Sequence, residues 1–186
     1  MKKIILASNS PSRAELLRRA NIEFIQKGVD FNEDSIETKI PKDFAYLASK
    51  GKLEVAKAKF GLDIPILTAD NVVTTKDGKL LRKPKDIDDA KRILALQSGA
   101  EIAIISAMHL LSKRIYFNDV SATFYRFREF DKKRVEEYLE SGDWRGKAGG
   151  CTIEGFCKEY IIEARGYEDT AKGLQVEKLL GWMKYV

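Results

Sequence analysis

Alternating strand and helix patterns along the sequence predict a mixed α/β protein. Three observations carry this prediction: short apolar runs typical of buried strands, longer segments of helical periodicity between them, and hairpin turns in the middle of the chain. The length of 186 residues suits a single domain with a substantial core. Hydrophobic residues at 44% and charged residues at 33% are typical of a folded globular chain and argue against disorder.

The first part of the chain predicts two strands separated by a helix. The apolar run at residues 3–7 is typical of a buried strand and is too short for the core of a signal peptide. After a Ser-Asn-Ser turn, Pro11 opens a helix with Ser10 as its N-cap, because proline is favoured at the first helical position. Asn21 ends this helix, and we expect a second strand at residues 24–29.

The middle of the chain predicts two helices around a strand and a hairpin. Helical periodicity covers residues 44–60, and a strand at residues 64–68 places Asp70 directly after its carboxyl end. An Asp-Gly turn at residues 76–79 is typical of a hairpin, and a helix follows at residues 86–96.

The remaining residues predict three more strands and two more helices. The strands are expected at residues 101–111, 114–126 and 157–164, and the helices at residues 132–141 and 174–183. No apolar run reaches the roughly 18 residues of a membrane span, so we expect no association with a membrane.

The net charge of +5 leaves two interpretations open. A basic excess suits an anionic partner such as nucleic acid, a nucleotide or another phosphate. Acidic residues are interleaved with the basic ones, however, which is also typical of an ordinary solvated surface.

The histidine and cysteine content excludes several kinds of site. One histidine, His109, excludes His-rich zinc sites, and its apolar neighbours favour a structural role. Cys151 and Cys157 do not have the spacing of a CxxC pair, so we expect a reduced, cytoplasmic protein in which both pack as small buried hydrophobes.

The turn between the first strand and the first helix is a candidate phosphate site. A helix N-terminus presents unpaired N–H groups and partial positive charge. Ser8 and Ser10 add hydroxyl donors, and Arg13 adds a guanidinium that can bind phosphate oxygens in a bidentate manner. The alternative is that Ser10 only caps the helix and Arg13 is solvated.

Two carboxylates and a lysine are further candidates. Asp70, at the end of a strand, can bind a divalent metal or act as a general base, and Glu33 in an acidic segment can supply a second carboxylate. Lys83 precedes a proline that fixes an extended backbone, so it can neutralise phosphate charge from a rigid segment. Taken alone, Asp70 is as typical of an ordinary turn, and Glu33 and Lys83 are more typical of a solvated surface.

A glycine-rich segment at residues 147–155 predicts a close backbone approach, either to a ligand or to another strand. Trp144, just before this segment, either covers a nucleobase or caps a loop.

Five strings in order along the chain resemble the Maf, or septum-formation, family of nucleotide pyrophosphatases. They are ASNSPSRAELL from Ala7, ADNVV from Ala69, RKPKD from Arg82, KAGGCTIEG from Lys147, and Gly166-Tyr167 with the later Gly173-Leu174. The resemblance covers nearly the whole chain. It implies a single domain over residues 1–186, with a twisted central sheet, flanking helices and two lobes around a cleft, as in the inosine triphosphate pyrophosphatases.

The resemblance implies hydrolysis of a nucleoside triphosphate between the α and β phosphates, with Mg²⁺ or Mn²⁺. Asp70, Glu33 and Lys83 would be catalytic, with Glu33 and Asp70 also binding the metal. The substrate-binding residues would be Ser8, Ser10, Arg13, Lys52 and Glu154. A homodimer is compatible with the resemblance but not required by the composition.

The sequence also departs from the family pattern. Ser12 replaces a basic residue, Asn71 a threonine, Glu154 a glutamine and Gln175 a proline. The family lysine of the preceding helix aligns with Gly51, and Lys52 can serve instead if the register shifts by one residue. These departures indicate a divergent member with altered base selectivity or weaker activity.

Two alternatives to the enzyme hypothesis follow. One is a nucleotide-binding regulator of septum formation that no longer turns over substrate. The other is a basic nucleic-acid-binding module, which the absence of any known nucleic-acid-binding string argues against. We therefore expect a nucleoside triphosphate, and no nucleic acid, as the partner.

Overall fold

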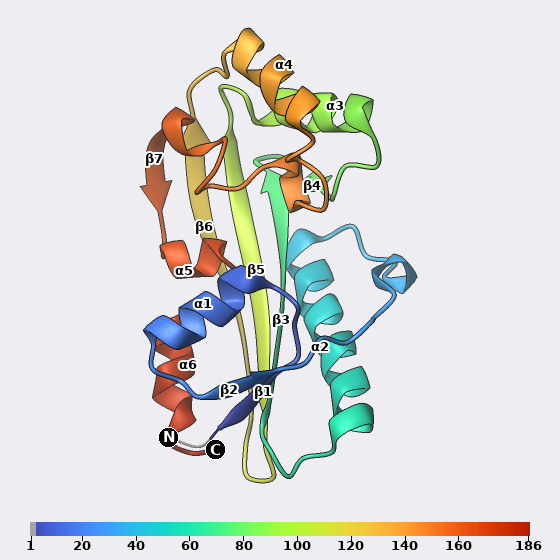
Figure 1. The fold of residues 1–186 in the computed structure, drawn as a ribbon, viewed down its shortest axis with the longest axis vertical. Coiled ribbons are helices and arrows are strands. Elements are labelled where there is room, and N and C mark those ends of the chain that lie inside the picture. Colours follow the sequence, from blue (N-terminus) through green and yellow to red (C-terminus); the bar gives the residue numbers. More distant parts are fainter. Residues whose placement is uncertain (1–2) are drawn as a thin grey trace.

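The protein is described over residues 3–186 by a computed structural model, in which seven strands form one mixed sheet (Figure 1). Three long strands run antiparallel through the molecule: β3 (Ile66–Thr75), β5 (Glu101–Leu111) and β6 (Tyr116–Phe127). The short strands β1 (Ile4–Leu6) and β2 (Phe24–Gln26) run parallel to β3, whereas β4 (Leu80–Leu81) and β7 (Ile161–Arg165) run antiparallel to their neighbours. The predicted mixed α/β class is confirmed.

One edge of β3 carries two short strands with an opening between them. β1 pairs with β3 at Ile66 and Leu67, and β4 pairs with it at Val73 and Thr74. The other edge is paired with β5 along its whole length. Residues 68–72 therefore face an opening in the sheet, and Asp70 lies at its centre.

The predicted end of this strand was wrong. Asp70 does not follow β3 but lies in the middle of it, because Val72 and Val73 continue the ladder with Ile105 and Ile104 of β5. The apolar run itself ends at Thr68, but the β-branched pair Val72-Val73 after Asn71 favours extended structure equally well. The polar pair Asp70-Asn71 is held within a strand and not in a turn.

The helices flank the sheet on both faces. α1 (Pro11–Arg19) begins with proline after the N-cap Ser10, and α2 (Pro41–Phe60) also begins with proline, three residues before the predicted start. Asp86 and Asp131 cap α3 (Ile87–Gln97) and α4 (Lys132–Ser141) through side-chain hydrogen bonds. The chain ends with α5 (Glu168–Ala171) and α6 (Val176–Met183).

Alternation along β1 and β3 assigns neighbouring residues to opposite faces of the sheet. Ile4 and Leu6 pack in the cluster that contains α1 and α6, whereas Ile5 packs in the cluster that contains α2. In β3 the same alternation directs Asp70 to α2 and Asn71 to α1. Both side chains reach the opening, from opposite faces.

A separate apolar cluster packs α3 and α4 against the far ends of the long strands. Trp144 lies in this cluster with 3% of its surface exposed, and its indole Nε1 donates to the Leu139 carbonyl at 3.0 Å. Of the two interpretations of Trp144, the structure selects the loop cap.

Two predicted elements near the C-terminus begin later than expected. The strand predicted from residue 157 begins at Ile161, because residues 158–160 form a 3-10 turn, and the last helix begins at Val176. The strand at residues 101–111 and the helix at residues 132–141 are confirmed with their predicted bounds. In the described part of the chain, no helix combines the length and apolar character needed to cross a bilayer.

Candidate active site

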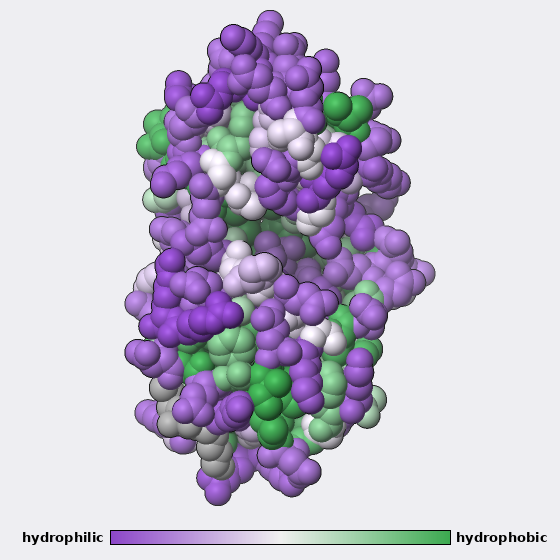
Figure 2. All heavy atoms as spheres, in the orientation of Figure 1, coloured by the Kyte–Doolittle hydropathy of each residue, from purple (hydrophilic) through white to green (hydrophobic). Residues whose placement is uncertain are grey.

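A cleft of about 1170 Å³ lies at the opening between β1 and β4. Figure 2 shows this face of the molecule hollowed at mid-height, with hydrophilic residues around the hollow. The β1–α1 turn, α2 and the middle of β3 contribute to the walls, together with the segment after β4, the glycine-rich loop and the residue that follows α5. The cleft therefore joins segments from both ends of the chain.

Arg13 is buried beside the cleft rather than solvated. Its Nη1 donates to Ser8 Oγ at 3.0 Å, its Nη2 to Asn71 Oδ1 at 2.9 Å, and its Nε to the Gly173 carbonyl at 3.2 Å. Burial lowers the pKa of Arg13 from its ordinary value, and the nearby Asp70 and Glu33 carboxylates oppose that effect. Three partners thus fix a cation at the N-terminus of α1.

The departure at Asn71 is explained by this arrangement, because its amide oxygen is one of the three acceptors of Arg13. The predicted N-cap is present as well: Ser10 Oγ accepts from the Arg13 amide at 3.4 Å, and the Ser10 amide donates to Ser8 Oγ at 3.2 Å. Ser8, Ser10 and Arg13 are therefore brought together, and Ser12 lines the same cleft.

Lys52 connects the two predicted acidic residues. Its Nζ donates to Glu33 Oε1 at 2.8 Å and also to Asp70 Oδ1. The lysine reaches the site from the middle of α2, and Glu33 reaches it from a short 3-10 turn, Glu33–Ser35. The structure places Glu33, Lys52 and Asp70 in one cluster, as the alternative register predicted.

The environment shifts the pKa values of these carboxylates in opposite directions. Burial raises the pKa of Asp70 above its ordinary value, against the charges of Lys52 and Arg13. Burial also acts to raise the pKa of Glu33, but the hydrogen bond and charge of Lys52, with Lys83 and Arg82, bring it below its ordinary value. Two carboxylates with opposite shifts in one cleft are typical of a catalytic site.

Gly51 makes room for a ring that the sequence did not single out. A Cβ atom at Gly51 would lie 2.3 Å from the ring of Phe31, which lines the cleft. A side chain at position 51 would displace that ring. Lys52, the next residue, carries the positive charge into the cleft.

Basic side chains line the wall opposite α1. Lys83 is exposed on the cleft and lies close enough to Glu33 to lower its pKa, and the following Pro84 is buried. Arg82 donates to Asp34 Oδ1 at 2.9 Å, and Lys85 and Lys147 also line the cleft. Of these residues, sequence reasoning predicted only Lys83, because its position before a proline singled it out. The other exposed basic residues carry no distinguishing pattern.

The glycine-rich segment approaches a strand, which decides between the two interpretations of its glycines. A Cβ atom on Gly149, whose φ is +71°, would lie 3.0 Å from a methyl group of Val73 in β3. Gln97 of α3 donates to the Gly149 carbonyl at 2.6 Å, and Tyr138 of α4 donates to the Gly150 carbonyl at 3.1 Å. The glycines pack the loop onto the sheet, so that the residues after them line the cleft.

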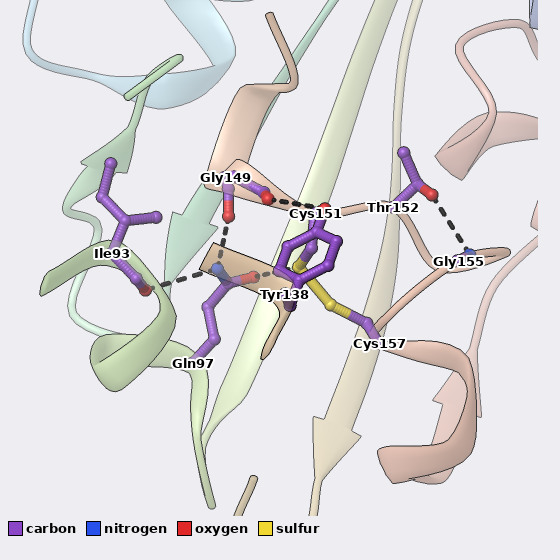
Figure 3. Close-up of a disulfide and its surroundings, with 9 residues drawn as sticks. Ile93, Gln97, Tyr138, Gly149, Cys151, Thr152, Gly155 and Cys157 are labelled. Atoms are coloured by element: carbon purple, nitrogen blue, oxygen red, sulfur yellow. Dashed lines mark hydrogen bonds between the residues drawn. A yellow bond between two sulfur atoms is a disulfide. The ribbon is translucent and has the colours of Figure 1, made fainter. Parts of the chain in front are cut away.

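A disulfide joins Cys151 and Cys157 in this loop (Figure 3). Between them the chain turns back on itself, with the Gly155 amide donating to the Thr152 carbonyl at 3.1 Å, and this turn brings the two Cα atoms within 6.4 Å. The prediction of two reduced, unpaired cysteines was therefore wrong. The six-residue separation gave no motif, and only the turn reveals the pairing.

Glu154, the last predicted substrate-binding residue, also lines the cleft. Its Oε1 accepts from Lys172 Nζ at 2.7 Å, and Lys172 also pairs with Glu168. Sequence reasoning missed Lys172, although it directly precedes the recognised Gly173-Leu174 pair.

The Maf resemblance implies a divalent cation, and the donor set at the opening fits one. Lys52 donates a hydrogen bond to one oxygen of Glu33 and to one oxygen of Asp70. Within residues 3–186, the second oxygen of each carboxylate accepts no hydrogen bond and is available to a metal ion. In that same range no three His, Cys, Asp or Glu side chains gather at metal-binding distances. Two carboxylates, with substrate phosphates and water as the other ligands, are the donor set that Mg²⁺ prefers.

A family model described as Maf-like protein matches residues 3–186. The chain belongs to the Maf family. A relative from a Nitratiruptor species, named nucleoside triphosphate pyrophosphatase, is 49% identical over 178 residues, which cover 95% of this chain and 96% of the relative. The resemblance drawn from the five strings is confirmed.

Two further comparisons concern proteins less similar to this chain. A relative from Pyrococcus furiosus, named dTTP/UTP pyrophosphatase, is 38% identical and covers 95% of this chain and 91% of its own. Among solved structures, a nucleoside-triphosphatase described as a dITP/XTP pyrophosphatase from Mycobacterium abscessus covers 98% of this chain and 96% of its own, at 16% identity and a TM-score of 0.47. That structural likeness is too distant to carry a conclusion about this Maf protein.

Proposed function

We propose that this protein is a nucleoside triphosphate pyrophosphatase that hydrolyses the bond between the α and β phosphates. One observation carries the proposal: a buried aspartate, Asp70, meets Lys52 and Glu33 at the opening of a cleft whose neighbouring wall is the N-terminus of α1. The names of the relatives from Nitratiruptor and Pyrococcus furiosus support the same activity.

The phosphates would bind at the N-terminus of α1. Its first amides and Arg13 offer donors there, and Ser8 and Ser10 add hydroxyl groups. Lys83 on the opposite wall would neutralise charge that develops on the departing phosphates.

Asp70 would act as the general base. Its carboxylate accepts a proton from a water molecule while the water oxygen forms a bond to the α phosphorus. The bond from the α phosphorus to the bridging oxygen breaks, and the bridging oxygen leaves with pyrophosphate, so the products are a nucleoside monophosphate and pyrophosphate. Burial of Asp70 raises its pKa and so makes it a better proton acceptor than an exposed carboxylate.

Glu33 and Asp70 would hold a divalent cation, Mg²⁺ or Mn²⁺. When bound, such an ion would supply positive charge that neutralises the phosphate oxygens. Lys52 keeps the two carboxylates close together in the free protein.

Residues 1–186 would work as one domain with two lobes around the cleft. The long strands β3, β5 and β6 extend through both halves of the sheet, while separate apolar clusters pack at its two ends. A homodimer, a cytoplasmic location and the absence of a nucleic-acid partner stay predictions.

The test measures pyrophosphate and nucleoside monophosphate released from a panel of standard and modified nucleoside triphosphates. The panel includes dTTP and UTP, because one relative is named for them. We expect both products in equal amounts from one or a few substrates with Mg²⁺ or Mn²⁺, and none after chelation. Tight nucleotide binding without release of pyrophosphate would contradict the proposal and favour the regulator of septum formation.

A further inference from the structure

Lys172 is a charged residue of the cleft to which the proposed mechanism gives no role. Only 10% of its side chain is exposed, and its Nζ pairs with both Glu154 and Glu168. These two partners raise the pKa of Lys172, so it stays charged over the whole neutral range. Its partner Glu154 lines the cleft with 51% of its side chain exposed.

The segment that carries Lys172 is anchored to the sheet. Ser106 of β5 donates to the Thr170 carbonyl at 2.6 Å, and Thr123 of β6 donates to the Tyr167 carbonyl at 2.6 Å. The next residue, Gly173, accepts the Nε bond of Arg13. Lys172 and Gly173 together connect Glu154, on the glycine-rich loop, to the arginine at the N-terminus of α1.

The charges explain why this connection matters. A nucleoside triphosphate carries several negative charges, and a half-exposed carboxylate on the wall of its cleft repels it. Lys172, Glu154 and Glu168 together carry a net charge of about −1, whereas without the ammonium the two carboxylates would carry about −2. A neutral side chain at position 172 and a neutral amide at position 154 would restore the net charge of −1.

We propose that Lys172 is a positioning residue for substrate binding: it holds and neutralises Glu154, so that the glycine-rich loop can face a polyanionic nucleotide. This inference rests on the proposed function, because it takes a nucleoside triphosphate as the occupant of the cleft. In this proposal Lys172 and Glu154 form one functional unit. The glutamate at position 154, where the family has glutamine, is compatible with substrate binding because a lysine 18 residues later neutralises it.

The test is a double-mutant cycle of Lys172→Met, Glu154→Gln and the double variant. The affinity for a triphosphate analogue with a non-hydrolysable α–β bridge is measured at several salt concentrations, together with KM and kcat for the preferred substrate. Lys178→Met is the matched control, because Lys178 pairs with Asp119 at 2.6 Å on a surface outside the cleft lining.

We expect Lys172→Met to raise Kd and KM by about five- to tenfold, with kcat within about twofold, because an uncompensated charge faces the phosphates. The slope of log Kd against log salt should fall in this variant. In the double variant Kd, KM and the slope should return to within about twofold of the wild-type values. Lys178→Met should change none of them.

Two results would overturn the proposal: unchanged binding in Lys172→Met, or a double variant as weak as Lys172→Met alone. The second result would mean that Lys172 contacts the nucleotide directly or is needed for packing. A wild-type protein that binds the analogue but releases no pyrophosphate would contradict the proposed hydrolysis, while the binding cycle would still decide the role of Lys172. Failure of the wild-type protein to bind any triphosphate would overturn both.

Discussion

Arg13 shows how much of this site is decided by single residues. Its guanidinium is buried among three acceptors, two of them side-chain oxygens and one the carbonyl of Gly173. Gly173 has a φ of +108°, and a Cβ atom there would lie 2.9 Å from Arg13 Nε. The glycine thus allows the backbone to approach the arginine and also adopts a conformation that other residues avoid.

Gly173→Ala should therefore weaken both stability and substrate binding. We expect the free energy of unfolding to fall by about 1–3 kcal/mol from backbone strain and KM to rise, because the methyl group displaces Arg13. Urea denaturation and steady-state kinetics measure the two effects. Gly181→Ala is the control, since nothing lies within 4 Å of its Cβ position in α6. Equal behaviour of the two variants would contradict this account of Arg13.

At the residue scale, the sequence predicted which residues gather at the cleft better than it predicted the contacts between them. Ser8, Arg13, Glu33 and Asp70 were predicted to act together, and the structure places them around one cleft. The contact of Lys172 with Glu154 could not be predicted, because Glu154 lies 18 residues earlier and no local pattern links the two. The other partner, Glu168, lies four residues earlier, at the ordinary spacing of a helical ion pair. Long-range charge pairs depend on the fold, which sequence spacing does not give.

At the scale of elements, the opening in the sheet is what creates the site. The pairing of β1 with β3 ends at Leu67 of β3, and the pairing of β4 with β3 begins at Val73 of β3. Residues 68–72 of β3 therefore have no partner strand on that edge. The sequence predicted a strand and a polar pair after it, but not that the strand continues. Periodicity identifies a strand, whereas the ends of its partner strands are decided by their turns.

The disulfide in the glycine-rich loop leads to a test of that element. Unfolded protein that has not been reduced should contain no free thiols. Reduction should lower the free energy of unfolding by about 2 kcal/mol, since the bridge closes a short loop. Thiol titration in denaturant and urea denaturation with and without a dithiol reductant measure these quantities.

The double variant Cys151→Ser/Cys157→Ser is the control and should not respond to the reductant. Two titratable thiols in the oxidatively purified wild-type protein would contradict the pairing. That result would restore the original expectation of two buried, reduced cysteines.

At the scale of the whole molecule, α2 is packed onto the long strands through a buried polar contact as well as through apolar ones. His109 of β5 is fully buried, with Nδ1 2.7 Å from the Tyr116 hydroxyl of β6 and Nε2 3.4 Å from the Tyr46 carbonyl of α2. The structural role predicted from its apolar neighbours agrees with this position. Burial lowers the pKa of His109, and the hydrogen bond with the Tyr46 carbonyl raises it by a smaller amount. The charge of Lys50 also lowers this pKa, and that of Glu54 raises it.

Stability should consequently decrease in mild acid. The unfolded histidine takes up a proton near pH 6.5, whereas the folded one does so only at lower pH, so protons favour the unfolded state. We expect the free energy of unfolding to fall as the pH drops below about 6.5, by at most about 1.4 kcal/mol per unit. Because His109 is the only histidine of the chain, His109→Gln should flatten the slope between pH 7.5 and 5.5 even if it lowers stability throughout. An unchanged slope would contradict the assignment.

The central claim is that turnover depends on the buried carboxylate at the opening in the sheet. The most direct measurement compares pyrophosphate release by Asp70→Asn and Asp77→Asn, the second an exposed aspartate in the turn after β3 and outside the cleft. With both variants folded, we predict that Asp70→Asn lowers kcat by about 100-fold or more, because a general base is lost, and that Asp77→Asn stays within about twofold of the wild type. Full turnover by a well-folded Asp70→Asn variant would contradict the account.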